Sequence, residues 1–154
     1  MKLTLSICIW ACCAQPLLSQ TFLNAATAVG IDVHVYDNLH GAGVSFVDFD
    51  QDGLDDLTFC EDSQIKFYRN NQGDVEELVL SIEVSNNANH PIWVDYDNDG
   101  DLDFFISQMQ GPNLLFEQTS AMVFENVTSD VGLPLLMDPS FGCSWGDYDR
   151  DGDL

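Results

Sequence analysis

One short acidic pattern occurs three times in this chain and constrains its fold more than any other feature. The pattern is D-x-D-x-D-G, and it begins at residues 48, 95 and 147, in the segments DFDQDGLDD, DYDNDGDLD and DYDRDGDL. These segments contain more than half of the 26 acidic residues, whereas the whole chain has only 4 Lys and Arg residues. A solvated acidic face or a disordered tail would spread its charges or collect them in one block. Acids gathered at three separate places instead indicate bound cations.

The residues around the acidic segments repeat as well. In each segment one aromatic residue stands two positions before the first Asp and another follows it directly, at Phe46 and Phe49, Trp93 and Tyr96, and Trp145 and Tyr148. A second element, FLNAATAVGI at 22–31, is matched by FENVTSDVGL at 124–133. Similarity that returns after about fifty residues is typical of a repeat architecture.

The stretches between the acidic segments have the composition of short strands separated by Gly, Asn, Asp and Gln. The expected strands are GVSFV, DLTFC, IKFYRN and EELVLSIEV in the first unit, and PIWVDY, LDFFIS, NLLFEQ and VFENVT in the second. No stretch shows a helical period long enough to compete. Four strands in a unit of about fifty residues match one blade of a β-propeller. We therefore predict an all-β fold of four-stranded antiparallel blades, incomplete in this chain.

The nine-residue spacing D-x-D-x-D-G-x-x-D suits a calcium loop. Oxygen ligands at positions 1, 3 and 5 point inward, Gly at position 6 permits a sharp reversal, position 7 offers its carbonyl, and Asp at position 9 completes the shell. An all-oxygen set without Cys or His favours Ca²⁺ over zinc or copper. The predicted metal ligands are Asp48, Asp50, Asp52, Leu54 and Asp56 in the first loop, Asp95, Asp97, Asp99, Asp101 and Asp103 in the second, and Asp147, Asp149, Asp151 and Asp153 in the third.

An EF-hand is the alternative calcium loop, and its spacing does not fit. Position 12 of an EF-hand is a bidentate Glu at the start of a helix. Position 12 here is Phe59 in the first loop and Ile106 in the second, each within a strand-like run. We therefore expect a β-hairpin to support each loop.

With these motifs in place, the sequence resembles the FG-GAP/VCBS repeat family of integrin-α-like blades. GVSFVDFDQDGLDDL, IWVDYDNDGDLDFFI and FYRNNQGD are similar to its repeat motifs, and the resemblance extends from about residue 22 to the end of the chain. It implies a β-propeller with Ca²⁺ in the blade hairpins, in a secreted or cell-surface protein. It also implies that residues 20–154 form two blades and the start of a third, as the N-terminal part of a longer protein. Because 22–31 resembles 124–133, we expect Phe22–Ala25 to be an outer strand, like Phe124–Val127 in the second blade.

The first residues differ from the rest and predict a signal peptide over 1–19. MKLTLSICIWACCAQPLLSQ has one Lys, a short apolar run and then small residues suited to cleavage, after either Ser19 or Ala14. A lipoprotein signal with Cys12 is an alternative, and either signal predicts a secreted or surface location without a membrane-spanning helix in this chain. Two cysteines would then remain, Cys60 and Cys143, and we expect both to be buried small hydrophobic residues.

A calcium-binding module that attaches to an extracellular protein or glycan is the function that these features favour. Nucleic acid is excluded as a partner because phosphate contacts need a basic surface. The alternative is the propeller domain of a secreted enzyme, for instance one acting on polysaccharide, with catalytic residues beyond residue 154. We predict no catalytic residue within the chain, since His34 and His40 lie in a loop with no partner motif and His90 precedes Pro91 at the start of a strand.

Overall fold

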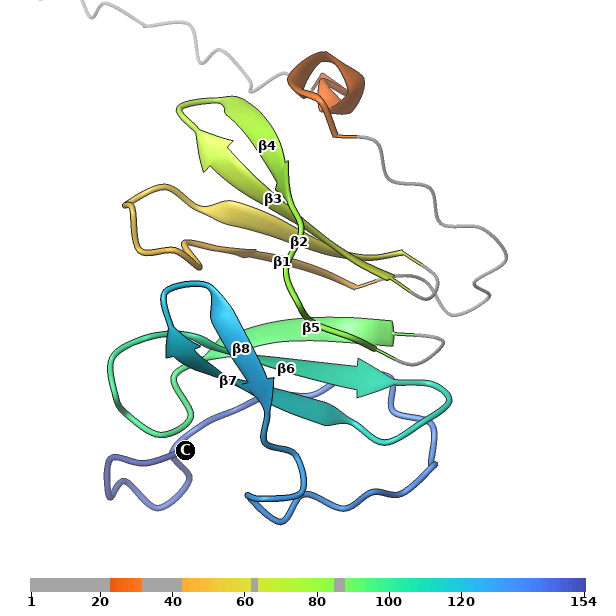
Figure 1. Cartoon of the computed structure of the whole chain (residues 1–154), viewed down its shortest axis with the longest axis vertical. Helices are drawn as coiled ribbons and strands as arrows, with labels where there is room; N and C mark the ends of the chain where they lie inside the picture. Colours follow the sequence, from red (N-terminus) through yellow and green to blue (C-terminus); the bar gives the residue numbers. More distant parts are fainter. Residues whose placement is uncertain (1–22, 32–42, 62–63, 85–87) are drawn as a thin grey trace, which may run out of the picture.

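The computed structural model describes residues 23–31, 43–61, 64–84 and 88–154, and it contains two four-stranded sheets, one after the other along the chain (Figure 1). The first sheet is formed by β1 (Val44–Val47), β2 (Asp56–Glu61), β3 (Gln64–Asn71) and β4 (Asp74–Leu78). The second is formed by β5 (Ala88–Val94), β6 (Asp103–Gln108), β7 (Leu114–Ser120) and β8 (Val123–Asn126). All neighbours are antiparallel and follow chain order, so each sheet is one blade. The predicted fold class is confirmed, as two blades that do not close a ring.

Helix is almost absent from the described residues. Their one helical element is the 3₁₀-helix η1 (Ala26–Val29), and no described helix is long and apolar enough to cross a membrane. The segment predicted as a signal peptide, 1–19, lies outside the described residues, as does the loop with His34 and His40.

The core lies between the two sheets and is built around Trp93 of β5. Its ring centroid lies 4.9 Å from those of both Phe49 and Phe104, and 5.8 Å from that of Phe124. The indole Nε1–H donates to Thr58 Oγ1 at 2.9 Å, which satisfies the polar atom of a buried side chain. Trp93 is therefore a core residue that joins the blades.

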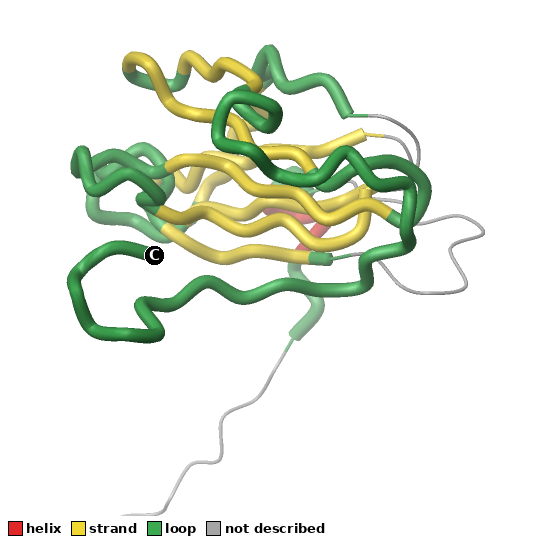
Figure 2. Tube along the Cα trace, turned by 90° about the horizontal axis from the view of Figure 1, so that it is seen from below, coloured by secondary structure: helices red, strands yellow, loops and turns green. Residues whose placement is uncertain are grey.

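Strand β6 is buried along its whole length because it is covered on both faces. Phe104 and Ile106 belong to the core between the sheets. Phe105 meets Trp145 from the segment after β8, with ring centroids 5.5 Å apart. This C-terminal segment runs along the second sheet in an extended conformation (Figure 2).

Two close contacts join the starts of successive units. Gly43 N donates to Asn89 O at 2.7 Å, and a Cβ at residue 43 would lie only 2.2 Å from that oxygen, so only glycine allows this approach. The Asn89 side chain donates through Nδ2 to Ser140 O and Phe141 O, each at 3.2 Å. Asn89 thus connects the entries of all three repeated units.

The fourth strand of the first blade differs from the prediction. The expected strand EELVLSIEV ends early, because β4 stops at Leu78 and residues 79–84 leave the sheet. Leu80, Ile82 and Val84 nevertheless pack against the core between the sheets. Their apolar alternation, which looks like a strand in the sequence, comes from this packing rather than from strand pairing.

The two copies of the second repeated element share a hydrogen-bonded Asn and a helical turn. Ala26 N donates to Asn24 Oδ1 at 3.2 Å, and Thr128 N donates to Asn126 Oδ1 at 3.1 Å. Both copies then form a helical turn that ends on a left-handed glycine, Gly30 or Gly132. The later copy begins with the outer strand β8, as expected. In the earlier copy residues 23–25 are not in a strand, and Phe22 lies outside the described residues.

Candidate metal centre

The acidic loops occupy equivalent places in the two blades. Loop 1 (residues 48–56) connects β1 to β2, and loop 2 (residues 95–103) connects β5 to β6. Residues Phe59 and Ile106 lie within β2 and β6, so each loop is held by a β-hairpin and not by an EF-hand helix. The loops also meet, because Gln51 Nε2 donates to Gly100 O at 2.8 Å. A third loop, loop 3 (residues 147–154), follows Trp145.

The first Asp of every loop accepts hydrogen bonds from the backbone of the same loop. Asp48 accepts from the N–H groups of Asp52 and Gly53, at 3.0 and 2.8 Å. Asp95 accepts from Asp99 and Gly100 at 3.1 Å each. Asp147 accepts from Arg150 and Gly152 at 2.5 and 3.1 Å. These bonds fold each loop back on its first carboxylate.

The third and fifth positions extend the same pattern. Asp50 and Asp97 each accept from the N–H two residues later, at 3.3 Å in both loops. The fifth-position carboxylates accept from the seventh-position N–H, in Asp52 at 2.9 Å, Asp99 at 3.1 Å and Asp151 at 3.3 Å. The repeated sequence pattern therefore produces one set of hydrogen bonds in loops 1 and 2, and loop 3 shares those from the sixth N–H to the first Asp and from the seventh N–H to the fifth.

Two residues in each loop adopt the left-handed conformation. At position 4 the φ angles are 60° for Gln51, 61° for Asn98 and 67° for Arg150. At position 6 they are 93°, 99° and 100° for Gly53, Gly100 and Gly152. Glycine adopts such angles without steric cost, which explains its place at position 6. The other side chains are tolerated at position 4 because the hydrogen-bonded loop fixes the backbone there.

The ninth-position carboxylates are the buried members of loops 1 and 2. Asp56 is 0% exposed and accepts from Phe49 N at 3.1 Å and Asn70 N at 2.8 Å. Asp103 is 1% exposed and accepts from Tyr96 N at 3.0 Å and Gln118 N at 2.9 Å. Each carboxylate therefore ties its loop to the third strand of the blade. The sequence predicted these residues as ligands only and missed this structural role.

Burial also changes the acidity of these carboxyl groups. It raises the pKa of Asp56 above its usual value, partly offset by the two backbone N–H donors. It raises the pKa of Asp103 to about 6, with the nearby Asp97 and Asp101 charges adding to the rise. A bound cation would favour the ionised form of both groups, because opposite charge lowers a carboxyl pKa.

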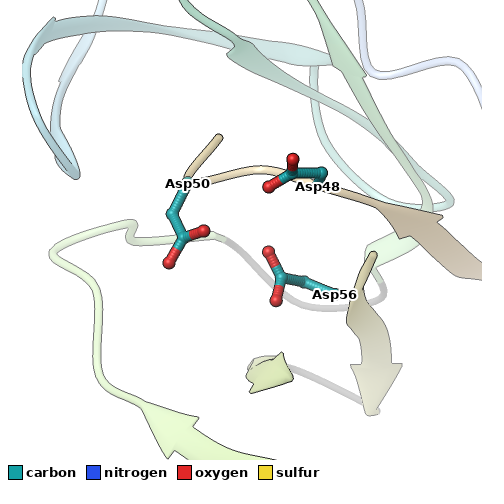
Figure 3. Close-up of side chains that lie close together, drawn as sticks. All are labelled: Asp48, Asp50 and Asp56. Atoms are coloured by element: carbon teal, nitrogen blue, oxygen red, sulfur yellow. The ribbon is translucent and has the colours of Figure 1, made fainter. Parts of the chain in front are cut away.

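Carboxylate oxygens converge in all three loops. Asp48, Asp50 and Asp56 point toward one another, and one oxygen from each lies within 4.8 Å of the others (Figure 3). Asp95, Asp97 and Asp99 form the same kind of group in loop 2, and Asp147, Asp149 and Asp151 in loop 3. The predicted ligands Asp52, Asp101, Asp103 and Asp153 lie outside these three groups, as does Leu54, which would offer its carbonyl. The converging donors are all carboxylates and fit a hard divalent cation.

The surroundings of loops 1 and 2 differ in charge. Arg69 of β3 lies beside loop 1, with its Nε 2.5 Å from Asp50 Oδ2. Loop 2 is accompanied by Glu117 of β7, whose Oε2 accepts from the Tyr96 hydroxyl at 2.9 Å. Burial and this bond raise the pKa of Tyr96, so the hydroxyl stays protonated and remains a donor.

A cavity of about 210 Å³ lies where the two loops meet the β7–β8 hairpin. Its lining includes Asp50 and Gln51 from loop 1, Asp101 from loop 2, and Gln118 and Met122 from the second blade. Asp101 Oδ1 is buried there and has no hydrogen-bond partner among the described residues. Burial raises the pKa of Asp101.

Among the described residues outside the loops, two cysteines and one histidine carry groups that could react. Cys60 is fully buried and its pKa is raised to about 12 by burial, which keeps the thiol protonated and inert. Cys143 is half-buried, so only Cys60 meets the expectation of a buried hydrophobic residue in full. His90 is half-buried in β5.

Comparisons with known proteins identify the repeats. The family model of the FG-GAP-like repeat matches residues 48–106 and again 95–154, and each match begins at the first Asp of a loop. Comparison with curated proteins gave no match, and comparison with solved structures gave none either. The two family matches together cover most of the chain and coincide with the repeated loops and blades described above. This chain therefore belongs to the FG-GAP-like repeat family.

Proposed function

We propose that this protein is a secreted or cell-surface calcium-binding module that attaches to an extracellular protein or glycan. One observation carries the proposal: in three loops far apart in the sequence, the first and fifth carboxylates accept from the sixth and seventh N–H groups, and carboxylate oxygens gather within 4.8 Å of one another. Like charges at such separations repel, and a bound cation would remove that repulsion. The predicted ligands, from Asp48 to Asp153, are the residues that would bind it.

Calcium would stabilise the blades through the hairpins. Loops 1 and 2 each join the first two strands of a blade, and the ninth Asp of each also bonds to the third strand. A cation that fixes the loop would therefore fix three strands at once. Because the unfolded chain has no assembled site, the free energy of metal binding would add to the free energy of folding.

The binding surface would be the end of the blades that carries the loops. Loops 1 and 2 lie together there, and the turns after β3 and β7 lie at the same end of their sheets (Figure 1). Metal-dependent order in these loops would then control attachment to the partner.

Calorimetric titration of the metal-free protein with Ca²⁺ tests the first part of the proposal. We expect dissociation constants of about 10⁻⁴ to 10⁻³ M, the range of extracellular calcium modules. Asp50→Ala and Asp97→Ala should each remove one site, whereas Asp55→Ala, which removes an exposed acid at position 8, should leave the sites intact. Absence of binding at roughly 10 mM Ca²⁺, tenfold above this range, would overturn the proposal.

Binding to an array of extracellular glycans and surface proteins, with Ca²⁺ and with EDTA, tests the second part. Calcium-dependent retention of one class of ligand is the expected result. Release of new reducing ends from a polysaccharide would instead identify the protein as part of an enzyme.

A further inference from the structure

The two complete blades place opposite charges at one equivalent position. Asn70 N bonds to Asp56 in the first blade, and Gln118 N bonds to Asp103 in the second, so these two residues correspond. The residue directly before each of them is Arg69 in β3 and Glu117 in β7. The position beside the metal loop is thus positive in one blade and negative in the other.

Arg69 contacts a carboxylate that belongs to the cation-binding group of loop 1. The distance from its Nε to Asp50 Oδ2 is 2.5 Å, and the Asp50 side chain is only 8% exposed. Asp50 Oδ1 accepts from Asp52 N within the loop, so the two oxygens of this carboxylate face different partners. Arg69 Nε is buried and makes no directed hydrogen bond within the described residues, which leaves charge as the main component of the contact.

Loop 2 has no such neighbour among the described residues. Its third-position residue, Asp97, is exposed. Glu117 binds the hydroxyl of Tyr96, the residue directly after the first Asp of the loop. Loop 2 therefore has an additional negative charge nearby, and its seventh position is Asp101 where loop 1 has Leu54.

We propose that Arg69 is a resident counter-ion of loop 1, which lowers the affinity of this loop for a divalent cation below that of loop 2. This inference rests on the proposed calcium binding and adds an order to it: loop 2 fills first and loop 1 second. The physical reason is that a fixed positive charge within a few ångströms of the site repels an incoming cation. The negative charge of Glu117 at the equivalent place attracts one.

Arg69 also holds Asp50 in position while loop 1 contains no metal. Arg69 forms an ion pair with Asp50 of loop 1, and its cross-strand neighbour in β4 is Glu76. Because the ion pair already neutralises one carboxylate, loop 1 depends less on metal for its order than loop 2 does.

Titration of the ¹⁵N-labelled protein with Ca²⁺, followed by NMR, tests this order. The amide resonances of Gly53, Gly100 and Gly152 report loops 1, 2 and 3 separately. In the wild-type protein, we expect Gly100 to respond at a lower Ca²⁺ concentration than Gly53. In Arg69→Gln, the Gly53 midpoint should fall about tenfold while the Gly100 midpoint is unchanged.

Lys66→Gln is the matched control. Lys66 lies on the same strand and pairs with Glu77, away from the loops, so its loss changes the net charge equally. It should leave all three midpoints in place. Arg69→Lys, which keeps the charge, should retain the low affinity of loop 1 and provides a folded comparison if Arg69→Gln fails to fold.

The outcomes separate the two proposals. No response of any glycine to Ca²⁺ would overturn the calcium proposal itself. If Ca²⁺ binds but the affinity of loop 1 is unchanged or lower in Arg69→Gln, only the counter-ion proposal is overturned. A lower affinity would show that Arg69 positions Asp50 for the metal.

Discussion

Loops 1 and 2 have the same backbone conformation, but the side chains around them differ in charge. In both, the first carboxylate accepts from the fifth and sixth N–H groups, and the ninth accepts from the second residue and the third strand. Loop 1 then adds Arg69 and the buried side chain of Asp50, whereas loop 2 adds Asp101 and Glu117. The repeated motif therefore determines the shape of the loop, and residues on neighbouring strands determine its charge.

The largest expected effect comes from removing the buried ninth-position carboxylate that loops 1 and 2 share. Asp56→Ala and Asp103→Ala should each lower the free energy of unfolding by about 3 kcal/mol, even with EDTA present, because each leaves two backbone N–H groups without their acceptor. Urea unfolding measures both, with Asp55→Ala as the control for loss of a nearby exposed acid. A variant that loses stability only in Ca²⁺ would show that its carboxylate is a ligand without the structural role.

The next effect concerns the contact that places the two blades together. Gly43→Ala should cost about 3 kcal/mol, because the new Cβ would lie 2.2 Å from Asn89 O and 2.7 Å from Pro91 Cδ. Gly142→Ala is the matched control, since a Cβ there meets nothing within 4 Å. Thermal unfolding compares the two variants, and equal melting temperatures would contradict the close approach of β1 to β5.

A smaller effect tests whether the loops act together. Gln51→Ala removes the hydrogen bond from loop 1 to Gly100 O and should cost about 1 kcal/mol of coupling between the loops. In a calcium titration, Ca²⁺ binding in loop 2 should then raise the Ca²⁺ affinity of loop 1 less than it does in the wild-type protein. Unchanged coupling would show that the two loops bind independently despite their contact.

The smallest effect comes from a substitution that makes loop 2 more like loop 1. Tyr96→Phe places at position 2 the residue that loop 1 has there, Phe49, and removes the bond to Glu117. We expect a loss of about 0.5 kcal/mol in stability, and a higher Ca²⁺ midpoint at Gly100 because the freed Glu117 side chain leaves the loop. Urea unfolding and the NMR titration measure the two changes. A lower Gly100 midpoint would contradict this role of Tyr96.

The sequence predicted the features that recur in each unit and missed the contacts that occur in one unit alone. The three Asp patterns and the short apolar runs predicted the blades and the hairpin loops, because these depend on local spacing. The chain at 79–84 looked like a strand, since packing on a core and pairing in a sheet give the same apolar alternation. Lys66 pairs with Glu77, and Arg69 pairs with Asp50. That Arg69 pairs with Asp50 depends on how β3 lies against loop 1, which no local pattern records.

Thermal unfolding of the protein in EDTA and in millimolar Ca²⁺ tests the central claim most directly. If loops 1 and 2 bind Ca²⁺ only in the folded state, a concentration tenfold above their dissociation constants should raise the melting temperature by about 10 °C. The double variant Asp50→Ala, Asp97→Ala should lose most of this rise. An equal melting temperature in EDTA and in Ca²⁺ for the wild-type protein would contradict the assignment of these loops as calcium sites.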